Sequence, residues 1–377
     1  MGIAEKIKAY NAQLVSRGLL RTRTVADDGL VSFESNDYLS LRKNAQISQA
    51  YQQGYKLFPA GSGGSMVLAG YHSCHQDLEE TFNQLLEVDA CILFSSGYAA
   101  NLAVTALLGA IDAHCLIDKG IHASVYDGLA LSGVNFSRYS HNDVNDFTRK
   151  LTKSDADMVM TEGIFSMSGQ IAPLSTVSAL CNRNNALLIV DEAHSYGVLG
   201  ANGKGSVAFW GLSQSDVPLR IIPFGKALAG QGALVAGRID LIEALLQAGR
   251  SLIYSTAISP ALCYGLLKTV ELVAAAEERR EKLNSLVCHF KEQIASSPLK
   301  WAISNTPIQQ LQLGCPHKAM RYAQALRTKG FGCSPIRTPT VRVPETGLRL
   351  ILNYTHQPEQ INELFKQLHI LHERQYL

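Results

Sequence analysis

The stretch Leu187-Leu188-Ile189-Val190-Asp191-Glu192-Ala193-His194 decides the fold of this chain. Its first four residues form a continuous apolar run, which is typical of a strand that is buried on both faces of a parallel sheet. Asp191 ends the run, so the strand would carry a carboxylate to the edge where open α/β sheets bind their ligands. Because a buried carboxylate is costly unless it meets a cation, Asp191 predicts a positively charged ligand at this edge.

On both sides of this run, short β-rich segments alternate with helical segments. We expect strands at 90–94, 114–118, 134–139, 157–161, 186–191, 220–223 and 232–236, and helices at 99–108, 123–132, 145–151 and 174–182. Strands that alternate with helices are joined by right-handed crossovers and form a largely parallel sheet. The sequence therefore predicts a three-layer α/β/α domain with a mostly parallel sheet.

The pattern changes near residue 260. We expect one long helix at 262–286, short strands near 308–313 and 348–352, and a last helix at 358–372. At the other end, residues 1–18 carry apolar side chains at helical spacing and should form a short amphipathic arm. The expected organisation is an N-terminal segment, a large ligand-binding domain and a smaller α+β domain, with the bounds 1–45, 46–260 and 261–377.

Composition excludes several classes of protein. Of the 377 residues, 46% are hydrophobic and 18% are charged, which describes a globular chain rather than a disordered or fibrous one. There are 34 Lys and Arg against 32 Asp and Glu, without a long basic run, so nucleic acid is not expected as a partner. No apolar stretch reaches the roughly 18 residues that span a bilayer. The eight cysteines form no C-x-x-C pair, and we expect a cytoplasmic protein with reduced thiols.

Several reactive side chains follow the expected strands. Ser96-Gly97-Tyr98 stands between a strand and a helix, where unpaired N–H groups and the helix dipole can hold a phosphate. His122 lies at a loop-to-helix transition, where its flat ring could stack on a ligand ring. Ser166 follows the strand at 157–161 and could donate a hydrogen bond to a ligand oxygen. Taken singly, each of these residues also has an ordinary explanation as a turn or capping residue.

Lys226 follows another apolar strand and stands between Gly225 and Ala227. Small and apolar neighbours disfavour the charged form of an amine, which makes it a better nucleophile and base. An acid, an imidazole and an amine at one sheet edge suit pyridoxal phosphate, because the amine can bond to its aldehyde and the acid can keep its pyridine nitrogen protonated. The alternative is a metal held by Asp191, Glu192 and His194, but no second His or Cys cluster stands at ligand spacing.

A set of motifs together resembles the α-oxoamine synthases, which are fold-type I enzymes that depend on pyridoxal phosphate. The motifs are Gly61-Ser62-Gly63-Gly64-Ser65, Gly70-Tyr71, His75-Gln76-Asp77-Leu78-Glu79-Glu80, Ser96-Gly97-Tyr98-Ala99-Ala100-Asn101, Phe165-Ser166-Met167, Asp191-Glu192-Ala193-His194 and Phe224-Gly225-Lys226. The resemblance runs from Arg21 to the last helix. It implies decarboxylative condensation of L-alanine with a pimeloyl thioester, carried by coenzyme A or an acyl carrier protein, as a step of biotin biosynthesis. It also implies a homodimer with shared active sites.

The resemblance assigns a role to each cofactor-binding residue. It implies that Lys226 bonds to the cofactor, that Asp191 pairs with the pyridine nitrogen, and that His194 donates to the phenolic oxygen. His122 would stack on the ring and stabilise an oxyanion, so Lys226, His122 and Asp191 are the expected catalytic residues. The remaining expected cofactor contacts are Ser96, Gly97, Tyr98, Ser166 and, from the other subunit, Thr256.

The resemblance also assigns the substrate-binding residues. Arg337 would bind the carboxylate of the amino acid, and Arg21 and Thr340 would line the acyl substrate. His122 and Asn36 complete the expected substrate site.

Three positions depart from the family pattern. Pro223 stands where relatives usually carry a threonine, and it offers neither a hydroxyl nor an N–H to a phosphate, so weaker cofactor binding is expected. Ser168 and Gln170 stand where acidic residues are common. A glycine-using member of the family, a fold-type I aminotransferase or lyase, and a non-catalytic relative that binds the cofactor remain the alternative functions.

Overall fold

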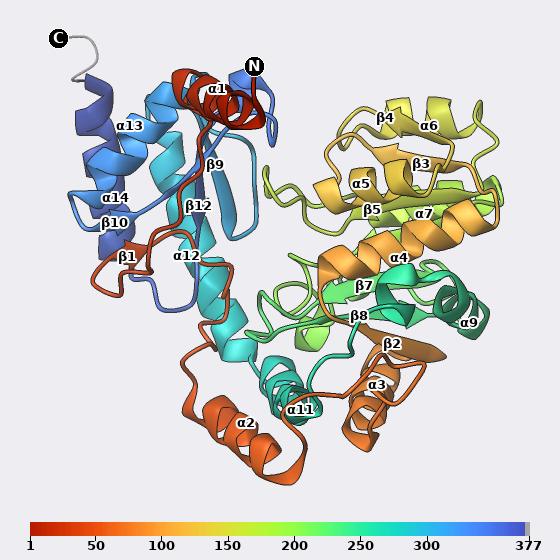
Figure 1. Ribbon diagram of the computed structural model, residues 1–377. Helices are drawn as coiled ribbons and strands as arrows, with labels where there is room; N and C mark the ends of the chain where they lie inside the picture. The colour runs from red at the N-terminus through yellow and green to blue at the C-terminus, as the bar shows by residue number, and fades with distance from the viewer. Residues whose placement is uncertain (374–377) are drawn as a thin grey trace. The chain divides into compact units, whose positions relative to one another are not determined.

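The structure is a computed structural model that describes residues 1–373. The chain divides into two compact units, and most of their elements are labelled in Figure 1. Unit 1 contains residues 1–35, 167–169 and 281 onwards, and unit 2 contains residues 36–166 and 170–280.

The core of unit 2 is a mixed, mostly parallel sheet. Its strands are β2 (Ala90–Phe94), β3 (Cys115–Asp118), β4 (Phe136–Tyr139), β5 (Met158–Glu162), β6 (Leu187–Asp191), β7 (Leu219–Pro223) and β8 (Ala233–Gly237). They lie in the order β2-β8-β7-β6-β5-β3-β4. The strands from β7 to β4 are parallel to one another, and β8 runs antiparallel to both of its neighbours. The expected α/β fold with a mostly parallel sheet is confirmed.

Helices cover both faces of this sheet, which is why its strands read as continuous apolar runs. Along β6, Ile189 packs into the cluster on one face, while Leu188 and Val190 pack into the cluster on the other. The first face carries α4 (Gly97–Ala110), α5 (Ala123–Leu131), α9 (Ile239–Ala248) and α10 (Arg250–Ile253). The second face carries α6 (Val144–Leu151), α7 (Leu174–Arg183) and α8 (Ser206–Phe209). The sheet is therefore the middle of three layers (Figure 1).

A further group of helices packs near β2. It consists of α2 (Ala45–Leu57), α3 (Ser73–Leu86) and α11 (Pro260–Ala274), with α11 in contact with both others. Glycines permit the close approach of α2 and α11. A Cβ on Gly54 would lie 2.4 Å from the carbonyl oxygen of Ala261, and one on Gly265 would lie 2.0 Å from the ring of Tyr51. Neither α2 nor α3 was expected from the sequence. Asn44 is an N-cap signal for α2, because its side chain accepts from the N–H groups of Gln46 and Ile47, and this signal was missed.

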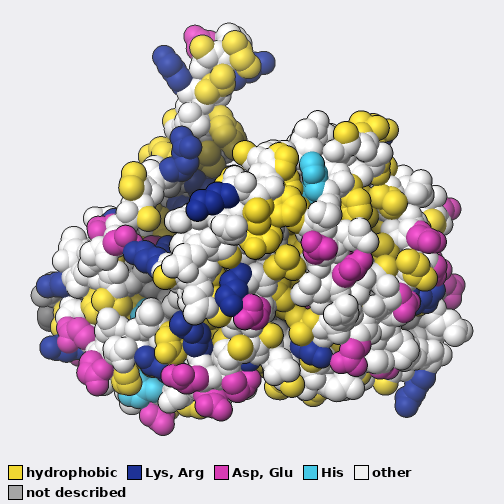
Figure 2. All heavy atoms as spheres, turned by 90° about the horizontal axis from the view of Figure 1, so that it is seen from below, with side chains coloured by type: hydrophobic (Ala, Val, Ile, Leu, Met, Phe, Trp, Pro, Cys, Tyr) yellow, Lys and Arg dark blue, Asp and Glu magenta, His cyan; other side chains and the backbone are white. Residues whose placement is uncertain are grey.

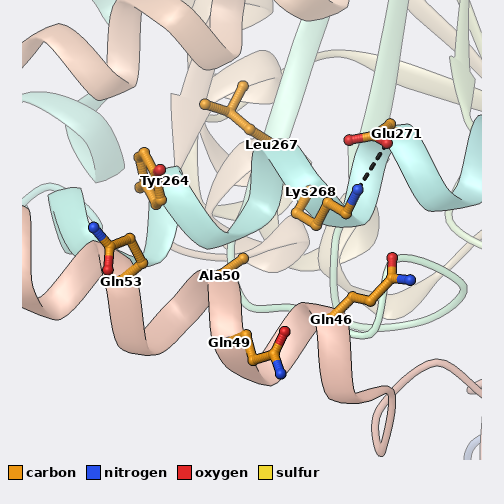
Figure 3. A pocket seen from close by; sticks show the side chains of 8 residues that line it. All are labelled: Gln46, Gln49, Ala50, Gln53, Tyr264, Leu267, Lys268 and Glu271. Atoms are coloured by element: carbon orange, nitrogen blue, oxygen red, sulfur yellow. Dashed lines mark hydrogen bonds and ion pairs between the residues drawn. The ribbon is translucent and has the colours of Figure 1, made fainter.

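An open hollow of about 590 Å³ lies between α2 and α11. Figure 3 shows that its walls carry the glutamines of α2 on one side, with Tyr264, Leu267 and Lys268 of α11 on the other. Lys268 is paired with Glu271 at 2.7 Å. None of the residues that line this hollow is a candidate site residue, so the catalytic groups lie elsewhere.

Unit 1 is built on a small antiparallel sheet. Its elements are α1 (Ile3–Ser16), β1 (Val31–Ser32), β9 (Ile308–Gln312), α13 (Pro316–Arg327), β10 (Phe331–Gly332), β11 (Ser334–Ile336), β12 (Gly347–Ile351) and α14 (Pro358–Glu373). β12 lies between β11 and β9, and β1 pairs in parallel with β10. Phe290, Trp301 and Phe365 pack together with ring centroids 4.9 to 5.4 Å apart. The expected helix in residues 1–18 is present as α1, and none of its residues is buried in the described chain.

The prediction of a single long helix at 262–286 is wrong. Two helices are found, α11 and α12 (Glu277–Ala295), which are separated at Ala275 and Ala276. The guanidinium of Arg280 donates to the carbonyl oxygens of Val273 at 2.7 Å and Ala274 at 3.2 Å, so α12 caps the open end of α11. The sequence there is rich in alanine and carries neither Gly nor Pro, so it gives no local sign of the break.

Three further observations concern the described residues as a whole and their surface. Across residues 1–373, none of the helices combines the length and the apolar character that spanning a membrane requires. All eight cysteines are free thiols, and most of them are buried. On the face that Figure 2 shows, basic, acidic and hydrophobic side chains are interspersed.

Candidate active site

The carboxyl ends of the parallel strands of unit 2 bring most of the candidate residues together. Asp191 ends β6, and its register partner Glu162 ends the neighbouring β5. Lys226 follows the end of β7, the neighbour of β6 on the other side. Parallel strands present these ends at one edge of the sheet, which is where such folds bind ligands.

Asp191 is a buried carboxylate, 5% exposed. Its Oδ1 accepts a hydrogen bond from the N–H of Ala193 at 2.9 Å, and its Oδ2 accepts one from Nδ2 of Asn101 at 3.0 Å. Both donors are neutral, so neither balances the negative charge. A buried charge of this kind is stable only when a cation lies nearby.

His122 caps the first turn of α5, beside Asp191. Its Nδ1 accepts from the N–H of Ser124 at 3.3 Å and lies 2.8 Å from the hydroxyl of Ser124. Partial burial of the ring lowers the pKa of His122, Asp191 raises it, and Lys226 lowers it again. The imidazole, the carboxylate and the amine are thus within electrostatic reach of one another, as the sequence predicted for one sheet edge.

Glu162 is a second buried acid at this edge that the sequence analysis did not single out. Its Oε2 accepts from the N–H of Ser166 at 3.0 Å, and this bond fixes the turn that carries Ser166. Burial raises the pKa of Glu162 well above its ordinary value, the charge of Asp191 raises it further, and Lys226 opposes both. The site therefore holds a carboxyl group, that of Glu162, which favours its neutral form beside Asp191.

His194 is held from the side by Tyr38, which the sequence analysis also missed. Nδ1 of His194 lies 2.6 Å from the hydroxyl of Tyr38, and that hydroxyl donates to Oδ1 of Asn36 at 3.3 Å. Tyr38 is fully buried and His194 is 5% exposed, so the ring has little freedom to rotate. This chain of contacts brings Asn36, an expected substrate residue, close to His194.

The turn that enters α4 has the features of a phosphate site. Ser96 caps the helix by accepting from the N–H of Ala99 at 3.1 Å. The N–H groups of Gly97 and Tyr98 are the first two of the helix and cannot be bonded within it. A Cβ on Gly97 would lie 2.5 Å from Cγ of Pro223, so only glycine lets the proline ring pack here. The side chain of Tyr98 points away to Asp127, to which its hydroxyl donates a hydrogen bond.

Thr256 lies near the same turn in its own chain. It lines a small crevice together with Ser95 and Ser251. The next residue, Ala257, is held by the turn at 62–64, because its N–H donates to the carbonyl of Gly64 at 2.9 Å and its carbonyl accepts from the hydroxyl of Ser62 at 2.9 Å. The resemblance assigned Thr256 to the other subunit of a dimer, and this proximity makes its own chain a second candidate.

The other substrate residues belong to unit 1. Nη1 of Arg337 donates to the carbonyl oxygens of Gly18 at 2.6 Å and Leu20 at 3.4 Å. Burial lowers the pKa of Arg337, and the nearby guanidinium of Arg21 lowers it further. Two cations held this close attract carboxylates, the kind of group that both were expected to bind. Thr340 is exposed in the same unit.

Glu192 and Arg220 form a buried ion pair behind the site. Oε1 of Glu192 accepts from Nη2 of Arg220 at 3.0 Å and from the N–H of Val207 at 3.0 Å. Its Oε2 accepts from the N–H and the hydroxyl of Ser206 at 2.8 and 2.7 Å, and from the hydroxyl of Ser195. Glu192 is 0% exposed and Arg220 is 4% exposed. These bonds fix the turn between Asp191 and His194.

Metal chemistry has no support from this arrangement. Within the described part of the chain, no three His, Cys, Asp or Glu side chains come together in a group that could hold a metal ion. The carboxylate of Glu192 is engaged with Arg220, Ser206 and Val207.

The residues present fit pyridoxal phosphate. Asp191 offers a buried carboxylate to a protonated pyridine nitrogen, and the first turn of α4 offers N–H groups to a phosphate. Lys226 supplies an amine, and His122 and His194 supply imidazoles beside it. The group would bring to this site a ring that withdraws electrons from a bonded amino acid.

Comparison with known proteins agrees with this reading. A family model described as aminotransferase class I and II matches residues 28–368. The 8-amino-7-oxononanoate synthase of Stutzerimonas stutzeri (strain A1501) is 40% identical over 92% of this chain and 88% of that protein. The enzyme of that name from Stenotrophomonas maltophilia (strain R551-3) is 40% identical over 97% of this chain and 93% of its own length.

Solved structures give the same fold. The 8-amino-7-oxononanoate synthase of Francisella tularensis is 29% identical, with a TM-score of 0.83 over 93% of this chain and 100% of that one. A serine palmitoyltransferase from S. paucimobilis has a TM-score of 0.90 over 99% of both chains at 23% identity, and it supports the fold alone.

The fold and the family match define a fold-type I enzyme whose cofactor is pyridoxal phosphate. With the relatives included, the chain belongs to the aminotransferase class I and II family and, within it, to the 8-amino-7-oxononanoate synthases, which are acyltransferases of biotin biosynthesis.

Proposed function

We propose that the protein condenses L-alanine with a pimeloyl thioester to give 8-amino-7-oxononanoate, carbon dioxide and the free thiol of the carrier. The observation that carries this proposal is Asp191, a buried carboxylate with only neutral donors, next to Lys226 and His122. The names of relatives that are 40% identical support the choice of substrates. The division into a cofactor-binding domain at 46–260 and a smaller domain at 261–377 belongs to the same proposal.

Each proposed role follows from what the side chain can do. When bound, pyridoxal phosphate accepts the electron pair that is left on the α-carbon of alanine. Asp191 keeps a proton on the pyridine nitrogen, which is what makes this possible. Lys226 would hold the cofactor through its amine and would act as the base that takes the α-proton of alanine. Its position near both Asp191 and His122 suits this work.

The remaining residues orient the substrates. Arg337 binds the carboxylate of alanine as a bidentate partner, and Arg21 and Thr340 line the acyl site. His122 donates to the oxygen that becomes negative when the thioester carbonyl is attacked. The new carbon–carbon bond forms as the thiol leaves, the carboxylate departs as carbon dioxide, and a proton returns to the α-carbon. The cofactor is held in place during these steps by Ser96, Gly97, Tyr98, Ser166 and His194.

A matrix of amino acids against acyl thioesters tests the substrates. Alanine, glycine and serine are each combined with acetyl, pimeloyl and palmitoyl thioesters of coenzyme A and of an acyl carrier protein, and products are identified by mass. We expect the 8-amino-7-oxononanoate mass with alanine and the pimeloyl thioesters only. A preference for glycine would identify a different branch of the family, and cofactor binding without product from any pair would support a non-catalytic relative.

We also propose a homodimer in which Thr256 of one chain serves the site of the other. Large apolar side chains on this part of unit 2 are exposed, including Leu68 at 83% and Tyr254 at 73%, and a second copy would cover them. Loss of a charge-assisted bond to the phosphate costs about 1.5–3 kcal/mol, so Thr256→Ala should bind the cofactor about 10- to 100-fold more weakly.

Mixing Lys226→Ala with Thr256→Ala, which is defective at limiting cofactor, distinguishes the chain that Thr256 serves. In a mixed dimer of Lys226→Ala and Thr256→Ala chains, a site shared between chains is rebuilt intact, and activity at limiting cofactor rises on mixing. If Thr256 serves its own chain, both sites of the mixed dimer stay defective and mixing restores nothing. Light scattering gives the mass of the particle, and a monomer there would refute the dimer.

A further inference from the structure

Two buried side chains that the proposed mechanism does not use connect His122 to Asp191. Nδ2 of Asn101, on α4, lies 3.0 Å from Oδ2 of Asp191 and 3.0 Å from Oγ of Ser124. Oγ of Ser124, on α5, lies 2.8 Å from Nδ1 of His122. Asn101 is 2% exposed and Ser124 is 0% exposed, so water does not compete for these bonds.

The chemistry of the four groups fixes the direction of each hydrogen bond. The carboxylate of Asp191 only accepts, so the amide NH₂ of Asn101 must face it. The same NH₂ donates its other hydrogen to Ser124, whose hydroxyl hydrogen is then directed to Nδ1 of His122. The backbone N–H of Ser124 also donates to Nδ1, at 3.3 Å. Because Nδ1 accepts twice, the proton of the neutral imidazole is on Nε2.

The two helices that carry Asn101 and Ser124 pack closely against each other. The hydroxyl of Thr105 donates to the carbonyl of Asn101 at 2.9 Å on α4. A Cβ on Gly128 of α5 would lie 2.1 Å from that hydroxyl, so glycine lets the two helices approach closely. The amide oxygen of Asn101 is buried without a hydrogen-bond partner within the described chain. An unpaired buried oxygen is costly, which is expected if Asn101 is retained for its NH₂ group.

We propose that Asn101 and Ser124 are positioning residues that hold His122 as its Nε2–H tautomer and join it to the carboxylate of Asp191. The Nε2–H of the ring is then available to donate a hydrogen bond to a ligand, while Nδ1 accepts both hydrogen bonds from Ser124. One continuous hydrogen-bond network then fixes the positions of two groups. They are the Asp191 carboxylate, which would face the pyridine nitrogen, and the His122 imidazole, which would face the reacting atoms. The charged groups that act on His122 are Asp191, Lys226 and Asp127. The inference rests on the roles proposed above for His122 and Asp191, but its first test does not.

The first test reads the tautomer directly in the cofactor-free protein. Nitrogen-15 NMR of histidine-labelled protein reports which ring nitrogen carries the proton, and the signal of His122 is assigned by its loss in His122→Gln. We expect an unprotonated Nδ1 in the wild type above its titration range, and a mixture of tautomers in Ser124→Ala. Asn101→Leu should give the same mixture, because the hydroxyl of Ser124 is then free to turn.

Thr105→Val is the matched control. It replaces a buried hydroxyl on α4 by a methyl group of similar size. The bonds between Asn101, Ser124 and His122 stay in place. We expect the wild-type tautomer in this variant. An unchanged tautomer in both Ser124→Ala and Asn101→Leu would overturn the proposal, and so would a tautomer in Thr105→Val as mixed as theirs. If Ser124→Ala does not fold, Asn101→Leu decides alone.

The second test measures the link to Asp191. Asn101→Leu removes one of the two hydrogen bonds to the carboxylate, which weakens its ionised form. We expect the cofactor dissociation constant from equilibrium dialysis to rise about 10-fold, because a buried hydrogen bond to a charged group is lost. Thr105→Val should leave the constant unchanged. Equal cofactor dissociation constants in Asn101→Leu and wild type would show that Asn101 does not support Asp191. This conclusion holds whatever substrates the enzyme proves to use.

Discussion

Replacement of Lys226 by alanine should lower kcat by a factor on the order of 10³ or more, because the variant loses both its covalent hold on the cofactor and its general base. The loss should not come with unfolding. Lys226 is half-buried in a turn that is closed by two backbone hydrogen bonds, from the N–H of Phe224 to the carbonyl of Gly232 and from the N–H of Gly230 to the carbonyl of Phe224. Neither bond involves the Lys226 side chain. Circular dichroism of the variant should match that of the wild type.

Borohydride reduction gives a readout that is independent of turnover. After the cofactor is added and the mixture is reduced, mass spectrometry of the digest should find the cofactor mass on the peptide that contains Lys226. Lys268→Ala, which removes a half-buried amine paired with Glu271, should keep both the tag and the activity. A tag on another lysine, or full activity in Lys226→Ala, would contradict the assignment.

The strands and the strand-end residues could be predicted because burial on both faces leaves a readable signal. The apolar run at 187–190 has no polar face, and the residue that ends it is the one that enters the ligand crevice. Asp191, Lys226 and His122 all follow strands, and the structure brings them within electrostatic reach of one another. Here the order of residues along the chain was sufficient.

The network around those residues could not be predicted in the same way. Asn101 and Ser124 lie inside helices, where each looks like any polar residue near a helix start. Their contacts depend on the close packing of α4 on α5, and on the strand order that places Asp191 near α4. Tyr38 meets His194 across 156 residues of sequence. Such contacts are set by tertiary packing, and no periodicity or spacing in a single sequence reports them.

The second large effect is expected from the ion pair behind the site. Replacement of Arg220 by methionine leaves Glu192 as a buried charge without its cation. Breaking a buried pair in this way typically costs about 3–5 kcal/mol of unfolding free energy. The remaining bonds from Ser195, Ser206 and Val207 to Glu192 are made by neutral donors and do not replace the lost charge.

An exposed ion pair provides the control for this prediction. Arg238 pairs with Asp240 at the protein surface, and Arg238→Met should cost at most about 1 kcal/mol, since exposed pairs contribute little. The free energies of unfolding of both variants are compared from urea unfolding curves, which are recorded by far-ultraviolet circular dichroism and by fluorescence.

Arg220→Met should also weaken the cofactor site. Glu192 directly follows Asp191 in the sequence, and its hydrogen bonds hold the turn that carries His194. Arg220→Met should therefore bind pyridoxal phosphate more weakly at temperatures where it is still folded, while Arg238→Met should bind it as the wild type does. Equal, small losses of stability in the two variants would show that the buried pair is no stronger than a surface one. A destabilised Arg220→Met with unchanged cofactor affinity would show instead that the pair supports the fold alone, and that the positions of Asp191 and His194 are fixed by Asn101 and Tyr38.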